Sequence, residues 1–397
     1  MERDFEVLKR FVVKDPDYLW DEWGLYAHYN DFVGLIGGRK SECSSVVEGY
    51  GNGAELGYDI ICSVGKSGLI FASYLAIKYK KPLIVYSVGE FIDQGAYVIG
   101  YGEYEKEMIK GKRILMIDSH VRTGNTIGVI NGLFLDKVSM GWLVLLDCRE
   151  DYDKMRSGGV NIKSIFAFDD KFREKLEADG VERSKLYDAD FWMKKEMYWL
   201  GRNGLMISSE SDGGFVAEKS NEICILPMNK HLYRDTKSFC PLKVYTDVNE
   251  FEDVANAFLN NIIGCCNEKK VLLITMTLGA VPLGVACANK FYENEKKDVG
   301  ILFPLYRSEK YYKDLIDEYA DGTIILMDDV ITTGGMLYEF YKRYLKGQVR
   351  RVVLASMLKV FMQKEEEEEK KFSSYFYRLV SDIIRCDGCV VVGGIVD

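Results

Sequence analysis

The stretch Thr323-Ile-Ile-Leu-Met-Asp-Asp-Val-Ile-Thr-Thr-Gly-Gly-Met336 decides the fold of this chain. Its first five residues are apolar or β-branched, a pattern that predicts a buried parallel strand. The carboxylates of Asp328 and Asp329 follow at the end of the predicted strand. A short polar loop comes next, and residues 336–344 have the spacing of a helix.

The polar loop has the composition of a phosphate site. Its backbone N–H groups and the positive end of the following helix dipole would face a phosphate. Gly334 and Gly335 allow the backbone to approach a ligand closely, and the hydroxyls of Thr332 and Thr333 can donate to phosphate oxygens. We therefore expect these four residues to bind a phosphate group.

The acidic pair adds oxygen acceptors beside that loop. The carboxylates of Asp328 and Asp329 suit a pair of ribose hydroxyls, or a magnesium ion held through water. An ordinary strand-to-helix turn with acidic N-caps is the alternative. The ordered combination of strand, acids, loop and helix favours a sugar-phosphate site.

Length and charge limit the classes of function. The chain has 397 residues, 48% of them hydrophobic, which suggests two domains with packed cores. A net charge of −9 argues against non-specific binding to nucleic acid. The first residues lack the apolar segment of a secretory signal, and no apolar run approaches the length of a membrane span. We expect a cytoplasmic protein without a membrane partner.

The ten cysteines are scattered along the chain. Cys386 and Cys389 form one Cys-x-x-Cys pair, and no second pair lies at the spacing of a zinc finger. We expect reduced thiols, as is typical of a cytoplasmic protein. A metal site at this pair is the less favoured interpretation.

A second phosphate-type loop lies near the start of the chain. It stands between a predicted strand and an apolar helix, and another strand follows, at residues 58–64, 69–78 and 82–88. This spacing predicts a right-handed crossover in a parallel sheet. Loop N–H groups at Ser67 and Gly68, together with the charge of Lys66, suit a pyrophosphate. A tight glycine turn with a solvated lysine is the alternative.

Each of these two loops occurs twice in the chain. The two copies are separated by nearly the same number of residues in both cases. Asp118 ends another predicted strand 210 residues before Asp328, and Gly124 precedes Gly334 by the same 210 residues. In the other pair of loops, Ser67 precedes Gly279 by 212 residues. Two motifs that recur in the same order at nearly one offset indicate a tandem duplication.

The two copies keep different parts of the site. The first has a single acid where the second has two, and its candidate ligand-binding residues are Asp118, Arg122, Thr123, Gly124, Asn125 and Thr126. Two interpretations of Arg122 stay open: its charge binds a phosphate, or its side chain blocks the phosphate site. A histidine such as His120 is more often packed or hydrogen-bonded within the protein than in contact with a ligand. In the second copy, Thr277, Leu278 and Gly279 form the other loop, so a pyrophosphate would rest there on backbone N–H groups alone.

Glycine- and serine-rich segments between the copies mark a linker near residues 205–215. We therefore predict an N-terminal domain at residues 1–207 and a C-terminal domain at residues 208–397. The fold class is α/β, with two tandem Rossmann-like parallel-sheet domains that carry helices on both faces.

The stretch from Thr323 to Met336 resembles the phosphoribosyl-pyrophosphate (PRPP) signature of the type I phosphoribosyltransferases. That pattern is four apolar residues, two acids, two apolar residues, Thr-Thr-Gly, any residue, then Thr or Ser. The chain departs from it at Met336. With the repeat, the resemblance implies two tandem, divergent phosphoribosyltransferase-like domains, and it covers roughly residues 58–147 and 271–357.

The resemblance implies a glycosyltransferase reaction of nucleotide metabolism. In it, a nitrogen of a nucleobase or a related acceptor displaces pyrophosphate from PRPP with the help of Mg²⁺. The metal would be held at Asp328 and Asp329, directly or through water. The family uses a mobile loop over the transition state, where Arg307 and Lys310 would act, with solvated surface cations as an equal alternative. The family's 6-oxopurine enzymes carry Asp at the position of Thr332, so that acceptor class is disfavoured.

Two further functions stay open at this point. Because both copies depart from the family pattern, the protein could instead be a non-catalytic regulator or a stress or defence effector that binds PRPP or a nucleotide. A PRPP synthetase-like kinase ranks third, since the sequence has no separate ATP-binding signature. Members with one domain commonly pair, so the resemblance also implies a homo-oligomer or an intramolecular pseudo-dimer.

Overall fold

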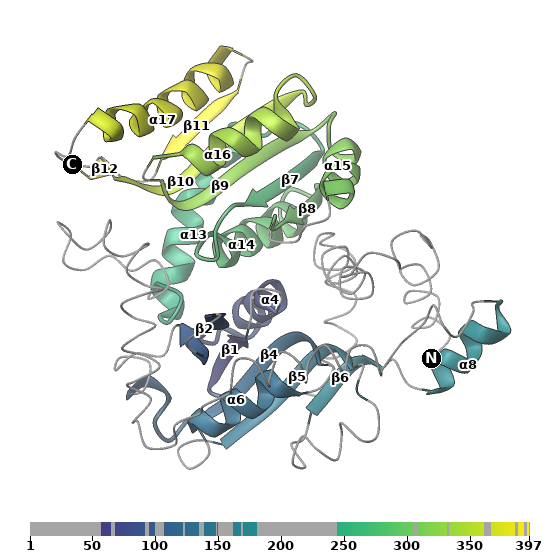
Figure 1. Ribbon diagram of the computed structural model, residues 1–397. Coiled ribbons are helices and arrows are strands. Elements are labelled where there is room, and N and C mark those ends of the chain that lie inside the picture. The colour runs from purple at the N-terminus through teal and green to yellow at the C-terminus, as the bar shows by residue number, and fades with distance from the viewer. Residues whose placement is uncertain are drawn as a thin grey trace. The chain divides into compact units, whose positions relative to one another are not determined.

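The computed structural model describes residues 57–64, 68–91, 95–99, 107–121, 124–134, 139–147, 149, 162–167, 170–180, 244–304, 309–331, 333–360, 367–385, 388–392 and 395–396. The chain divides into two compact units, each built on its own sheet (Figure 1). No helix within these residues is both long and apolar enough to cross a membrane. The predicted boundary at 207/208 lies outside the described residues.

The N-terminal unit contains a six-stranded sheet with the order β3-β2-β1-β4-β5-β6. Its strands are β1 (Ile60–Val64), β2 (Leu83–Phe91), β3 (Gly95–Ile99), β4 (Arg113–Val121), β5 (Ser139–Asp147) and β6 (Ile162–Ala167). All neighbours are parallel except β3, which pairs with β2 in antiparallel fashion. The described helices in this part of the sequence are α4 (Leu69–Tyr79), α6 (Asn125–Phe134) and α8 (Asp170–Ala178).

The C-terminal unit contains a parallel sheet with the order β11-β10-β9-β7-β8, and β12 also pairs with β10. Its strands are β7 (Lys270–Thr275), β8 (Asp298–Leu302), β9 (Thr323–Ile331), β10 (Arg351–Val360), β11 (Cys389–Val392) and β12 (Ile395–Val396). Its helices are α13 (Val248–Ile263), α14 (Ala280–Glu293), α15 (Glu309–Glu318), α16 (Gly335–Phe340), the π-helical turn η4 (Tyr341–Leu345) and α17 (Glu367–Arg385).

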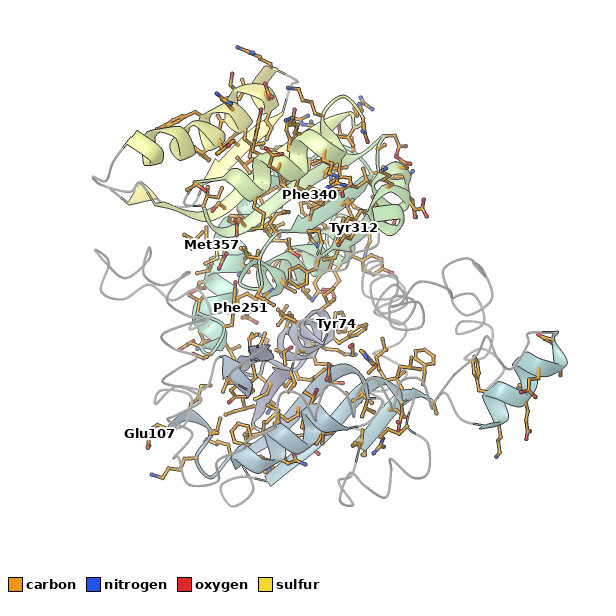
Figure 2. The ribbon with its side chains drawn as sticks, in the orientation of Figure 1. Tyr74, Glu107, Phe251, Tyr312, Phe340 and Met357 are labelled. Carbon is orange, nitrogen blue, oxygen red and sulfur yellow. A yellow bond between two sulfur atoms is a disulfide. The ribbon has the colours of Figure 1, made fainter. Side chains whose placement is uncertain are left out.

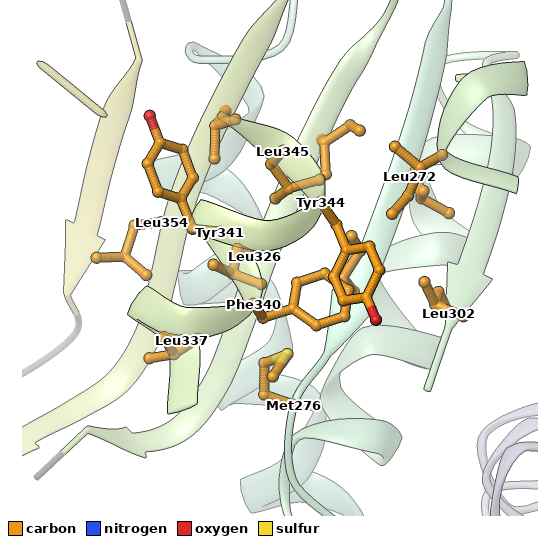
Figure 3. Close-up of a cluster of buried hydrophobic side chains, with 14 of the residues drawn as sticks. Leu272, Met276, Leu302, Leu326, Leu337, Phe340, Tyr341, Tyr344, Leu345 and Leu354 are labelled. Atoms are coloured by element: carbon orange, nitrogen blue, oxygen red, sulfur yellow. The ribbon is translucent and has the colours of Figure 1, made fainter. Parts of the chain in front are cut away.

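The apolar start of β9 lies in the core of this unit, as the sequence predicts. Ile324, Ile325, Leu326 and Met327 are fully buried. Leu326 lies beneath the helical segment that carries Phe340, Tyr341 and Tyr344 (Figure 3). Burial of each large apolar side chain contributes about 1.5–3 kcal/mol to folding, so this packing fixes the strand that carries the acidic pair.

The structure extends β9 beyond its predicted end. Asp328 and Asp329 lie within the strand rather than after it, because pairing with β10 continues to Ile331. Asp328 is opposite Ser356, and Ile331 is opposite Lys359. Strand pairing therefore continues both before and after the two acids, and it fixes the backbone that carries their carboxyl groups.

The parallel strands of the two units follow the same order. The order β2-β1-β4-β5-β6 in the first unit matches β8-β7-β9-β10-β11 in the second. β4 and β9 both have nine residues, and their first residues are 210 residues apart. Asp118 pairs with Val144 and Asp328 with Ser356, so even the register of the neighbouring strand recurs. Two parallel-sheet α/β units confirm the predicted fold class.

One disulfide departs from the expectation of reduced thiols. Cys265, just after α13, is joined to Cys389 of β11, with 6.2 Å between the two Cα atoms. That expectation is wrong for this pair, since the fold brings together two cysteines that are 124 residues apart in sequence. Cys62, Cys266 and Cys287 are free and buried, and burial raises the pKa of the Cys266 thiol to about 11.

Candidate ligand-binding site

The acidic pair lies at a switch point of the C-terminal sheet. The chain leaves β7 through α14 toward β8, and it leaves β9 through α16 toward β10, on the opposite side. In open parallel sheets, ligands bind outside the carboxyl ends of the two strands at such a point. Thr277 follows β7, and Asp328 and Asp329 lie near the carboxyl end of β9.

A threonine hydroxyl joins the two carboxyl groups. Oγ1 of Thr277 lies 2.7 Å from Oδ1 of Asp328 and 2.7 Å from Oδ1 of Asp329. Both carboxyl groups are buried, with 5% of each residue exposed. The three groups form a compact oxygen cluster, and the hydroxyl has only one proton to donate to the two carboxyl groups.

Burial and like charge act together on this cluster. Removal from water raises the pKa of the Asp328 carboxyl well above its usual range, and the negative charge and hydrogen bond of Asp329 raise it further. The hydrogen bond from Thr277 opposes this change. Among the described residues, burial and the charge of Asp329 therefore outweigh the hydrogen bonds that lower the pKa of Asp328.

The loop after β7 touches the acidic pair through a glycine. A Cβ atom added to Gly279 would lie 2.6 Å from Cγ of Asp329 and closer still to its Oδ2 atom. No side chain fits between this backbone and the carboxylate. The predicted loop of Thr277, Leu278 and Gly279 therefore lies directly against the predicted acidic pair.

The second predicted loop also lies beside this strand end. Gly334 has φ of +74° and caps the start of α16, while the N–H of Gly335 donates to Oγ1 of Thr333 at 3.3 Å. A Cβ atom at Gly334 would lie 3.2 Å from the Cα of Phe376, whose N–H donates to the carbonyl of Thr333. Phe376 belongs to α17, so this helix packs against the loop. The rings of Tyr375 and Tyr338 also pack together, with 5.7 Å between their centroids.

The N-terminal unit repeats part of this geometry with different side chains. Oδ1 of Asp118 accepts the N–H of Ser119 at 2.7 Å, and the buried hydroxyl of Ser119 lies 2.9 Å from Nδ1 of His120. Gly124 has φ of +81°, as Gly334 has φ of +74°. Ser119 stands where the C-terminal unit has Asp329, so this half keeps one carboxylate.

The upstream loop of the N-terminal unit also touches its central strand. A Cβ atom at Gly68 would lie 2.7 Å from the carbonyl oxygen of Ile117 and 2.9 Å from the Cα of Asp118. Thr126 is half-buried in the first turn of α6. Six predicted site residues lie outside the described residues: Lys66, Ser67, Arg122, Thr123, Arg307 and Thr332. The same holds for the side chains of Asn125 and Lys310.

Two residues of this site carry no signal in the sequence. The hydroxyl of Tyr245 donates to the carbonyl of Gly279, and Phe376 contacts Gly334. Both aromatic residues come from segments that are distant in sequence from the loops they support. An isolated tyrosine before a helix and a phenylalanine within one are common core residues, so only the fold identifies them.

The oxygen atoms of this cluster fit a magnesium ion. Two carboxylates and a hydroxyl are hard oxygen donors of the kind that Mg²⁺ takes, and a cation would offset the like charge of the two buried carboxyl groups. Within the described residues, no group of three or more His, Cys, Asp or Glu side chains could hold a metal ion. Asp328 and Asp329 would therefore hold the ion together with water or ligand oxygens.

Comparisons with known proteins give partial structural matches only. No protein-family model and no curated protein matches the chain. An orotate phosphoribosyltransferase from Aeropyrum pernix aligns at 24% identity over 35% of this chain and 78% of its own, with a TM-score of 0.28. A hypothetical protein from Neisseria gonorrhoeae with bound ppGpp aligns at 15% identity over 38% and 93%, with a TM-score of 0.27.

An adenine phosphoribosyltransferase from Thermoanaerobacter pseudethanolicus aligns at 16% identity over 32% of this chain and 81% of its own, with a TM-score of 0.26. The strand order and the geometry at Asp328 and Asp329, rather than matches of this extent, support the function that follows.

Proposed function

We propose that the C-terminal unit binds PRPP with Mg²⁺ and transfers its phosphoribosyl group to a nitrogen of a nucleobase or related acceptor. The observation that carries this proposal is the buried pair Asp328 and Asp329, joined by Thr277 and touched by Gly279 at the switch point of the sheet. The hydroxyls of a sugar diol would donate hydrogen bonds to the two carboxylates. A hydrated cation would instead offset their negative charge.

Each part of the proposed site has one role. The carboxylates of Asp328 and Asp329 accept hydrogen bonds from the ribose hydroxyls, directly or through the hydrated ion. The loop at Thr333 and Gly334 binds the 5′-phosphate through its backbone N–H groups. Gly334 has a left-handed conformation at the start of α16, where backbone N–H groups can bind an anion. The loop from Thr277 to Gly279 receives the pyrophosphate in the same way.

The proposed reaction is a displacement at the anomeric carbon of the ribose. The bond from this carbon to the pyrophosphate oxygen breaks, the bond to the acceptor nitrogen forms, and the nitrogen loses its proton to solvent. Bound magnesium would neutralise charge on the leaving pyrophosphate. The protein's own part is to position the two reactants and to stabilise charge.

We infer that the two units arose by tandem duplication. The strand orders agree, β4 and β9 are 210 residues apart, and each unit places a positive-φ glycine at the start of the following helix.

The N-terminal unit is the better candidate for a non-catalytic binding role, since Ser119 and His120 replace the second carboxylate and its neighbour. A regulator that binds PRPP or a nucleotide is thus the second candidate function.

Release of pyrophosphate from PRPP tests the proposed function. The wild-type protein, with Mg²⁺ and a panel of nucleobases, is expected to release pyrophosphate with at least one base. The double variant Asp328→Asn/Asp329→Asn is expected to lose at least about 100-fold in rate, because the loss of several kcal/mol of positioning corresponds to factors of this size.

Asp321→Asn is a matched control for that double variant. Asp321 is an exposed acid of the same unit that pairs with Lys270 at 3.0 Å. Its replacement should leave the rate unchanged. Binding of PRPP without turnover for any base would favour the regulator, and equal turnover by wild type and the double variant would contradict the proposed site.

A further inference from the structure

Tyr245 is fixed in place just before α13. Its side chain is 1% exposed, and its ring packs edge-on against Phe251 with 5.0 Å between the centroids; Figure 2 labels Phe251 on α13. Asp247 caps the start of the helix, because its Oδ1 atom accepts the N–H of Asn249 at 2.9 Å. The position of the Tyr245 hydroxyl is therefore set by a buried ring and a capped helix.

The hydroxyl of Tyr245 holds the loop that touches the acidic pair. It donates to the carbonyl of Gly279, the residue whose backbone lies against the carboxylate of Asp329. Glycine has no side chain to anchor it, so a hydrogen bond to its carbonyl is an effective way to fix the orientation of this peptide. The N–H of the same peptide, that of Ala280, donates to the carbonyl of Thr277 at 3.2 Å, so this peptide closes the turn that carries the loop N–H groups.

We propose that Tyr245 is a positioning residue that sets the affinity of this loop for the pyrophosphate group of the ligand. This inference rests on the proposed function, because it assigns the pyrophosphate of PRPP to the loop from Thr277 to Gly279. Tyr245 does not touch the ligand in this proposal. It acts through the Gly279 carbonyl, and it leaves the ribose and 5′-phosphate contacts unaffected.

The chain offers a closely matched control in Tyr319. This tyrosine is also buried, lies in the same unit, and donates its hydroxyl to Oδ1 of Asp298 at 3.1 Å. Asp298 is the first residue of β8, which runs parallel to β7. The loop follows the last residue of β7, so Asp298 and the loop lie at opposite ends of these parallel strands. Tyr319→Phe thus removes a buried tyrosine hydroxyl from the same core, with a hydrogen bond to a side chain rather than to the loop.

Two ligands separate a positioning role from a general loss of structure. PRPP carries the pyrophosphate, whereas ribose 5-phosphate shares the ribose and the 5′-phosphate but lacks it. With Mg²⁺ present, Tyr245→Phe is expected to weaken the binding of PRPP about tenfold, which corresponds to about 1.4 kcal/mol. Binding of ribose 5-phosphate is expected to stay unchanged, and Tyr319→Phe should bind both ligands as the wild type does.

Equal weakening of both ligands, or equal effects of the two tyrosine variants, would overturn the inference. Amide hydrogen exchange of residues 276–281 provides a second readout that needs no ligand. Exchange in Tyr245→Phe is expected to be faster than in Tyr319→Phe. If the wild type binds no PRPP, the proposed function fails, and unchanged exchange at these residues would separately refute the role of Tyr245.

Discussion

Gly279→Ala is expected to abolish measurable binding of magnesium–PRPP and to lower the free energy of unfolding by about 1–3 kcal/mol. The added Cβ atom would lie 2.6 Å from Cγ of Asp329, inside the contact distance of two carbon atoms. Either the carboxylate gives up its hydrogen bond to Thr277, or the loop moves away from β9. Both changes separate the loop from the acidic pair.

Calorimetry with PRPP and urea unfolding measure the two effects. Gly264→Ala is the control, because Gly264 lies in the same unit and a Cβ atom there would have no neighbour within 4 Å. This control is expected to bind PRPP like the wild type. Tight binding by Gly279→Ala would show that the loop and Asp329 do not act as one site.

Asp328→Asn is expected to stabilise the metal-free protein at neutral pH. Burial, followed by the charge of Asp329, raises the pKa of the Asp328 carboxyl in the folded state. Such a group favours folding below its unfolded pKa of about 3.9, and this contribution is lost as the pH rises through the folded-state pKa. Asparagine does not ionise, so the variant gains on the wild type by about 1.4 kcal/mol for each unit of raised pKa.

Urea unfolding between pH 4 and 7, with a chelator present, checks this dependence. The advantage of Asp328→Asn should be absent near pH 4 and should grow with pH. Asp321→Asn should show the opposite sign or no effect, because the hydrogen bond from Lys270 lowers the pKa of Asp321. A difference between wild type and Asp328→Asn that does not vary with pH would contradict a raised pKa of Asp328 in the folded state.

The parts of the site that the sequence reveals are those encoded within one short segment. An apolar run, two acids, a glycine loop and a helix follow one another without interruption from Thr323, so local patterns specify the order of β9, the loop and α16. The repeat at Asp118 extends the same pattern to β4 and predicts a second parallel sheet. Strand order then places the loop after β7 beside the end of β9.

Contacts between distant segments are the parts that the sequence does not reveal. Tyr245 reaches Gly279 and Phe376 reaches Gly334 only because helices α13 and α17 pack near these loops. The extension of β9 past its acids depends on its pairing with β10, and the Cys265–Cys389 disulfide depends on where β11 joins the sheet. None of these contacts changes the local pattern of residue types from which predictions are made.

Calorimetric titration of PRPP with Mg²⁺ into three proteins tests the central claim most directly. The wild type and Asp118→Asn are expected to bind, because the complete acidic pair lies in the C-terminal unit. The double variant Asp328→Asn/Asp329→Asn is expected to show no binding. Binding retained in the double variant, or absent in the wild type, would contradict a PRPP site at Asp328 and Asp329.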